Sequence, residues 1–98
     1  MKLNAIFSKT GDMRFISHLD LMRLFGRALR RAGLPVAITQ GFSPHLKISI
    51  SRALKLGVES ESEELVVDMS ERIPADIIRQ SLNNKLPAGV RIKEIKEF

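Results

Sequence analysis

Residues 17–35, SHLDLMRLFGRALRRAGLP, carry the clearest structural signal in the chain. Ser17 suits the N-cap position, because its hydroxyl can accept a hydrogen bond from an unpaired N–H of the first turn. Gly33 is placed for the left-handed C′ position, with Leu34 after it and Pro35 barring continuation. Apolar residues recur between these ends at helical spacing, namely Leu21, Leu24, Phe25, Ala28, Leu29 and Ala32. The stretch therefore predicts one helix with one face packed on a sheet.

A second side of the same helix is basic, with Arg23, Arg27, Arg30 and Arg31. Residues 1–55 hold ten Lys or Arg against two acids, a net charge of +8. Residues 56–98 hold six against nine, a net charge of −3. We therefore expect the first half of the chain to provide the surface for a polyanion or for an acidic partner protein.

The composition excludes several classes of site. The chain has no cysteine, so it cannot supply a disulfide, a thiolate zinc site, the ligands of an iron–sulfur cluster or a cysteine nucleophile. No apolar run approaches the ~20 residues needed to span a membrane, and the N-terminus lacks a signal-peptide pattern. We expect one cytoplasmic domain over residues 1–98 with no cofactor, no metal and no membrane partner.

The remaining segments predict strands and one further helix. Strands are expected at residues 2–8, 36–39, 46–51, 64–69 and 90–98, and a helix at 73–86. Whether the second and third of these strands form a hairpin stays open. The order fits an α+β fold, the ferredoxin-like βαββαβ sandwich, in which two helices cover one face of an antiparallel sheet. The other face is open or covered by a further lobe.

Three segments allow finer predictions. Pro74 suits the first turn of the second helix. Residues 52–63 look irregular and close in the acidic run ESESE, where the absence of EF-hand spacing favours a flexible solvated loop over a cation site. The last strand has a blurred alternation, which leaves its register undecided. The apolar side of the second helix is expected to contain Ile77, Ile78, Leu82 and Leu86.

Several motifs resemble a known family. They are RFISHLDLMR at 14–23, RRAGLP at 30–35, QGFSPH at 40–45, KIS at 47–49 and LGVES at 56–60. In this order and at this spacing they resemble the bacterial radical SAM-associated protein family, domain of unknown function 2344. The resemblance implies a radical SAM protein as partner. It also implies a role near RNA processing, RNA modification or the ribosome, because the family's genes tend to lie near those for ribosomal proteins and a ribonuclease of the E/G type. Members usually continue well beyond this length, which implies either a truncated chain or the first lobe of a longer protein.

The basic residues are the first candidates for a functional site. The helix arginines can contact successive phosphates, which gives salt-dependent affinity without sequence readout. The alternative is a solvated helix face with scattered acidic neighbours. The residues that can join this face are Arg14 and Lys47, and further along the chain Lys9, Arg52 and Lys55.

Two histidines and one carboxylate are the second candidates. His18, Asp20 and His45 can lie near one another if the 40–45 loop approaches the helix start. They would then act as acid and base on an RNA 2′-hydroxyl, or form a weak metal site. The alternatives are a specific RNA contact without chemistry and a pair of structural histidines that hydrogen-bond loop backbone.

The 40–45 loop is the third candidate. Its backbone N–H groups can contact a phosphate, although a plain structured turn needs no ligand. The residues expected to make contact are Gly41, Phe42, Ser43 and His45.

These observations predict a non-catalytic RNA-binding module beside a radical SAM enzyme. The alternative is an adaptor that docks on an acidic surface of its partner protein, and a third reading is a small metal-free endoribonuclease. The chain has no Tyr or Trp, and none of the expected strands carries the paired stacking aromatics of the RNA-recognition motif. The oligomeric state is not predicted.

Overall fold

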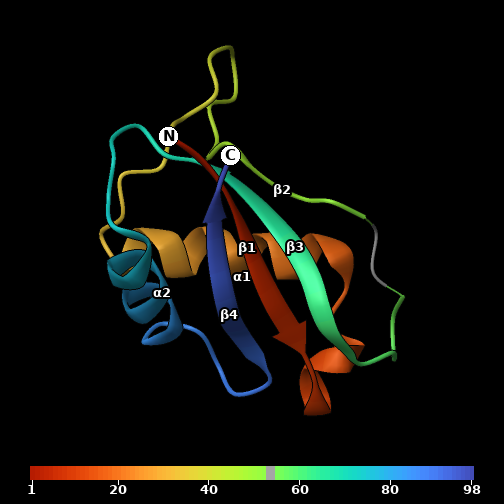
Figure 1. Ribbon diagram of the computed structural model, residues 1–98. Helices are drawn as coiled ribbons and strands as arrows, with labels where there is room; N and C mark the ends of the chain where they lie inside the picture. Colours follow the sequence, from red (N-terminus) through yellow and green to blue (C-terminus); the bar gives the residue numbers. More distant parts are fainter. Residues whose placement is uncertain (53–54) are drawn as a thin grey trace.

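The computed structural model describes residues 1–52 and 55–98. In these residues, four strands form one antiparallel sheet and two α-helices lie on one of its faces (Figure 1). The order of the strands across the sheet is β2-β3-β1-β4, which confirms the predicted α+β fold and agrees with a ferredoxin-like sandwich. None of the described helices is long and apolar enough to cross a membrane. The elements are β1 (Lys2–Lys9), a 3-10 helix (Gly11–Phe15), α1 (His18–Arg31), β2 (Ile48–Ile50), β3 (Ser60–Asp68), α2 (Ala75–Asn83) and β4 (Val90–Glu97).

Helix α1 has the ends that its sequence predicts. The Ser17 hydroxyl accepts a hydrogen bond from the backbone N–H of Asp20 at 3.1 Å. At the other end Gly33 has a φ of +70°, and the N–H of Leu34 donates to the carbonyl of Leu29 at 3.2 Å. This is the Schellman arrangement, which satisfies carbonyls that the last turn leaves unpaired.

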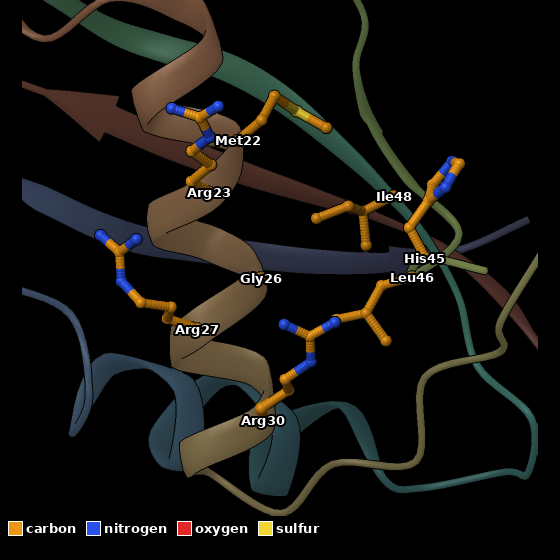
Figure 2. A pocket seen from close by; sticks show the side chains of 8 residues that line it. All are labelled: Met22, Arg23, Gly26, Arg27, Arg30, His45, Leu46 and Ile48. Atoms are coloured by element: carbon orange, nitrogen blue, oxygen red, sulfur yellow. The ribbon is translucent and has the colours of Figure 1, made fainter. Parts of the chain in front are cut away.

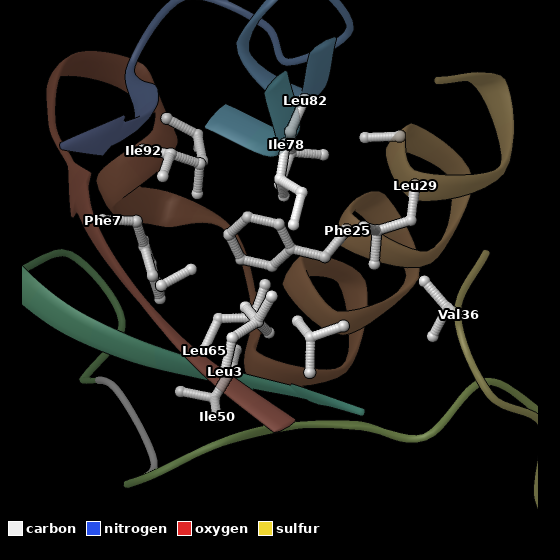
Figure 3. Close-up of a cluster of buried hydrophobic side chains, with 14 of the residues drawn as sticks. Leu3, Phe7, Phe25, Leu29, Val36, Ile50, Leu65, Ile78, Leu82 and Ile92 are labelled. Carbon is white, nitrogen blue, oxygen red and sulfur yellow. The ribbon is translucent and has the colours of Figure 1, made fainter. Parts of the chain in front are cut away.

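The core lies between the two helices and the sheet (Figure 3). Phe25 of α1 and Phe7 of β1 are both fully buried, and their rings meet edge to face with centroids 4.9 Å apart. Ile78 and Leu82 of α2 reach the same cluster from the side. Burial of this apolar surface is the main force that holds α1 against the sheet.

Helix α2 is shorter than the predicted 73–86. It begins at Ala75, with Pro74 at the N-cap in an extended conformation, and it ends at Asn83. The side chain of Asn83 both donates to the carbonyl of Ile92 and accepts from its N–H, which anchors the end of the helix to β4. Ile77 was predicted on the apolar side but is 53% exposed, because only residues four apart, such as Ile78 and Leu82, share the face that meets the sheet.

The segment from 36 to 51 contains only one short strand. Val36 and Ile38 make isolated bridges to Met69 and Leu46, so 36–39 and the start of 46–51 meet in an irregular hairpin. Only Ile48–Ile50 forms a regular strand, β2, which pairs with β3 at the edge of the sheet. Residues 39–46 project away from the body of the molecule as a loop (Figure 1).

Strand β3 begins four residues earlier than predicted, and the acidic run is not a flexible loop. Ser60 pairs with Lys9, and Glu63 pairs with Phe7, so β1 organises this run into the sheet. Glu63 faces inward and is 2% exposed. Ala53 and Leu54, which belong to the segment predicted as irregular, lie outside the described residues.

A bulge in β4 explains its blurred alternation. Ile6 pairs with Glu94 while Phe7 pairs with Ile92, so Lys93 is the extra residue. A single extra residue reverses the alternation beyond it. Val90 and Ile92 are therefore buried before the bulge, and Ile95 packs against the core after it.

Candidate functional site

A groove of about 390 Å³ lies between α1 and the segment that leads into β2 (Figure 2). One wall is the side of α1, and the other is the end of the 40–45 loop with the start of β2. We call this hollow the arginine groove. It is lined by Met22, Arg23, Gly26, Arg27, Arg30, His45, Leu46 and Ile48.

The arginines follow the solvent side of α1. Arg30 reaches from α1 toward Leu46, whereas Arg27 points away from His45 (Figure 2). Arg23 is paired with Asp20 at 3.4 Å, an exposed contact of little energetic weight. Among the described residues, no carboxylate lies within 4.0 Å of the guanidinium of the three others, all of them exposed: Arg27, Arg30 and Arg31.

Four of the other acids form ion pairs away from α1. Glu61, Glu63, Glu94 and Glu97 pair with cations of their own half of the chain or with Arg52. These pairs lie on the sheet strands and their flanks, away from α1. Within the described chain, Arg27, Arg30 and Arg31 are therefore three unpaired cations gathered on one helix. Other described cations without an ion-pair partner, such as Lys47, Arg79 and Arg91, are spread over other segments.

His45 stands at the rim of the groove, and its ring is turned away from α1 (Figure 2). Its Nδ1 lies 2.9 Å from the carbonyl oxygen of Ser43. Because a carbonyl can only accept, Nδ1 must carry the hydrogen, and in the neutral ring Nε2 is then left as an acceptor. The backbone N–H of His45 donates to the Thr39 hydroxyl at 3.1 Å, so the loop itself holds the ring in place.

Four residues of the groove were missed by the sequence analysis as site residues. Met22, Leu46 and Ile48 are half-buried and give the groove an apolar floor. Gly26 lies beside them, and a Cβ at this position would meet nothing within 4 Å. One signal was available: a glycine in the interior of a strong helix, far from any turn.

The rest of the 40–45 loop is exposed. Phe42 is completely accessible to solvent, so its ring does not anchor the loop by burial. Gly41 has a φ of +129°, a conformation that side chains disfavour. Ser43 contributes its carbonyl to the His45 ring.

The predicted acid–base group is not gathered in the groove. His18 is the first residue of α1 and is exposed, and it does not line the groove that holds His45. Asp20 engages Arg23. Within residues 1–52 and 55–98, no three His, Asp or Glu side chains cluster closely enough to hold a metal ion, so His18, Asp20 and His45 do not form the two-histidine, one-carboxylate site.

Two further cations of the predicted interface do not line the arginine groove. Arg14 donates to the carbonyl of Gly11 at 2.8 Å and stacks on the Phe15 ring, 4.3 Å from its centroid. Lys47 is exposed and borders a second hollow at the edge of the sheet, which adjoins the arginine groove because both are lined by His45, Leu46 and Ile48. Their part in nucleic-acid contact stays a prediction.

Lys9, Arg52 and Lys55 form a separate cluster around Glu63, so the suggestion that they join the arginine face was wrong. Lys9 is fully buried, and its ammonium donates to the carbonyl of Lys55 at 3.1 Å. Arg52 donates to both carboxylate oxygens of Glu63, at 2.9 and 2.7 Å. The hydrogen bonds from Arg52 are the main reason that the pKa of Glu63 lies below its usual range, with burial acting in the opposite sense.

Comparison with known proteins identifies the family of this chain. The model of the family DUF2344, an uncharacterized protein conserved in bacteria, matches residues 2–98. This chain belongs to that family. The family description assigns no activity, and no curated protein gives a significant match.

Proposed function

We propose that this DUF2344 chain is an RNA-binding module that holds the phosphate backbone on the outer side of α1. The observation that carries the proposal is the row of exposed arginines, three of which have no carboxylate within 4.0 Å in the described part of the chain. An isolated cluster of cations on an exposed surface is electrostatically unfavourable unless an anion meets it. Such a surface therefore favours a polyanionic ligand.

The spacing of the arginines suits a repeating anion. Residues four apart on a helix are separated by about 6 Å along its axis, which is comparable to the distance between neighbouring phosphates of one strand. Arg23, Arg27 and Arg31 follow this spacing, and Arg30 adds a second guanidinium near the end of the row. Each guanidinium can bind a phosphate bidentately. The backbone would thus be positioned without sequence readout.

We also propose that the module works beside a radical SAM enzyme, as the resemblance of its motifs implies. Radical SAM chemistry needs an iron–sulfur cluster with cysteine ligands, and this chain has no cysteine. The cluster and the chemistry would belong to the partner, while this chain would hold the RNA. Co-purification of the two proteins from cells that express both, with and without ribonuclease, tests whether they associate directly.

An adaptor for an acidic protein is the second candidate. Phe42 is fully exposed and Leu19 is 58% exposed. Large apolar side chains near basic residues are common where proteins dock on one another. This candidate predicts affinity for the partner protein and none for RNA.

Fluorescence anisotropy with labelled single-stranded RNA at several salt concentrations tests the RNA proposal. For single strands, log K is expected to fall with log salt by about 0.7 for each phosphate neutralised. The variant with Arg23, Arg27, Arg30 and Arg31 all changed to Ala should therefore bind weakly and have a slope reduced by up to about 3. Circular dichroism first establishes that the variant is folded.

A matched control removes the same charge from the sheet. Lys2, Arg91, Lys93 and Lys96 are exposed on β1 and β4, and their joint change to Ala should leave most of the affinity and slope. Equal losses in both variants would contradict a site on α1. If the wild-type protein fails to bind RNA even at low salt, the RNA proposal is wrong and the adaptor becomes the leading candidate.

A further inference from the structure

We infer that the arginine groove receives one unstacked base of the bound RNA, so that the module selects single strands over duplexes. This inference rests on the proposed function. It adds a preference for single strands, because a row of arginines alone does not distinguish single-stranded from duplex RNA. Duplex nucleic acid has the higher density of phosphate charge. Charge alone therefore predicts binding to duplex at least as tight as to a single strand.

The shape of the groove is the first argument. Its floor is formed by half-buried apolar side chains, Met22 and Ile48 among them, while its rims carry guanidinium groups. An apolar floor between cations suits a ligand with a flat, weakly polar ring and an anionic group on either side of that ring. A nucleotide with its base turned inward has this form.

Gly26 is the second argument. Glycine in a helix interior costs about 0.5–1 kcal/mol relative to alanine. Nothing in the fold requires a glycine here, because Gly26 has no positive φ and a Cβ would meet no atom within 4 Å. The missing side chain leaves the groove open beside Met22 (Figure 2). The glycine thus costs helix stability and widens the site.

The rim supplies the third argument. Hydrogen-bonding of Nδ1 to the Ser43 carbonyl leaves Nε2 of His45 as the acceptor. Because the ring is turned away from α1 (Figure 2), the suitable donor is a polar hydrogen of the nucleotide where it extends past Leu46 to the loop side of the groove. Arg30 reaches toward Leu46 across the groove, where its planar guanidinium can stack on a base. In a duplex the edges and faces of the bases are engaged within the helix, and the groove stays empty.

The experiment compares three probes of equal length at one salt concentration: single-stranded RNA, duplex RNA, and a single strand with abasic sites. Wild-type protein should bind the intact single strand about tenfold more tightly than either of the others. Gly26→Leu should remove this preference while the salt dependence of single-strand binding stays the same, because the arginines remain. Gln80→Leu, on the exposed side of α2, adds a leucine away from the groove and should change nothing.

A second variant keeps the test valid if Gly26→Leu fails to fold. Gly26→Ala adds one methyl group where the space is open, so it should raise the midpoint of thermal unfolding and reduce the preference for single strands. Equal affinity for single strand and duplex, or an unchanged preference in both Gly26 variants, would overturn the inference and leave the phosphate-binding proposal intact. Absence of any RNA binding by the wild-type protein would overturn both.

Discussion

Among single residues, Glu63 has the most unusual surroundings of any acid in the described chain. It is 2% exposed, and Arg52 donates to both of its oxygens. Ser60 donates a further hydrogen bond to the same carboxylate. These donors lower the pKa of Glu63, and the bonds from Arg52 contribute most. A carboxylate whose folded pKa lies below its unfolded value adds stability above about pH 4.3, and this stability is lost as the pH falls through the folded pKa.

The change Glu63→Gln should lower the free energy of unfolding at neutral pH by about 1–3 kcal/mol. The amide nitrogen of Gln cannot accept a hydrogen bond, so one of the two bonds from Arg52 is lost. The change also removes a negative charge that interacts with buried Lys9. We expect a loss smaller than the 3–5 kcal/mol of a fully buried pair, because Arg52 is 72% exposed.

Urea denaturation at a series of pH values measures this effect. The gap between wild type and Glu63→Gln should begin to narrow as the pH falls below about 4.3, and it should close once the pH has fallen through the lowered folded pKa of Glu63. Glu71→Gln, at an exposed position, is the matched control and should stay within about 0.5 kcal/mol of wild type. A gap that is constant with pH would show that packing, and not charge, is responsible.

Among the elements, α1 has three faces with separate roles. Its inner face, with Leu21, Phe25 and Leu29, is buried against the sheet. Its outer face carries the arginines, and its flank at Gly26 opens the groove. Because the ends of the helix are defined by its own cap residues, the positions of all three faces are determined locally. Substitution of Ser17 therefore tests directly how much the stability of the helix depends on its N-cap.

Replacing Ser17 with Ala should reduce the free energy of unfolding by about 1 kcal/mol, because the N–H of Asp20 loses its acceptor. Ser17→Asp keeps an acceptor and adds a negative charge at the positive end of the helix dipole, so it should retain most of the stability. Thermal unfolding followed by circular dichroism distinguishes the two variants. The same loss in both would indicate that the hydroxyl has a role other than capping.

In the whole molecule, one cluster joins both helices to the sheet. Phe25 stands near its centre, against Phe7 of β1 and close to side chains of α2 (Figure 3). A domain of this size has a total stability of only about 5–15 kcal/mol. Loss of one central ring therefore affects every element at once.

The change Phe25→Ala should cost about 3–5 kcal/mol, since it removes buried apolar surface and leaves a cavity. We expect helix and sheet signals to disappear together in one transition shifted to lower urea concentration. Phe42→Ala is the matched control: its ring is fully exposed, so stability should change by no more than about 0.5 kcal/mol. Separate transitions for α1 and the sheet would show that the cluster does not unite the fold.

The features that could be predicted from the sequence are those that depend on residues close together in the chain. The N-cap at Ser17, the stop at Gly33 and the two faces of α1 depend on contacts within about one helical turn. The order of strands and helices, and with it the ferredoxin-like arrangement, follows from such patterns. The row of arginines was readable for the same reason, because helical spacing places these side chains on one side.

Contacts between distant segments decided the rest. Pairing with β1 drew the acidic run into β3, and a bulge at Lys93 set the register of β4. Burial of Lys9 and Glu63 depends on residues about fifty positions apart meeting in one cluster. The groove likewise exists only because the segment after the loop, from His45 to Ile48, runs along the flank of α1. The helix or strand propensity of a segment does not predict such long-range contacts, because they result from chain connectivity and from packing around the common core.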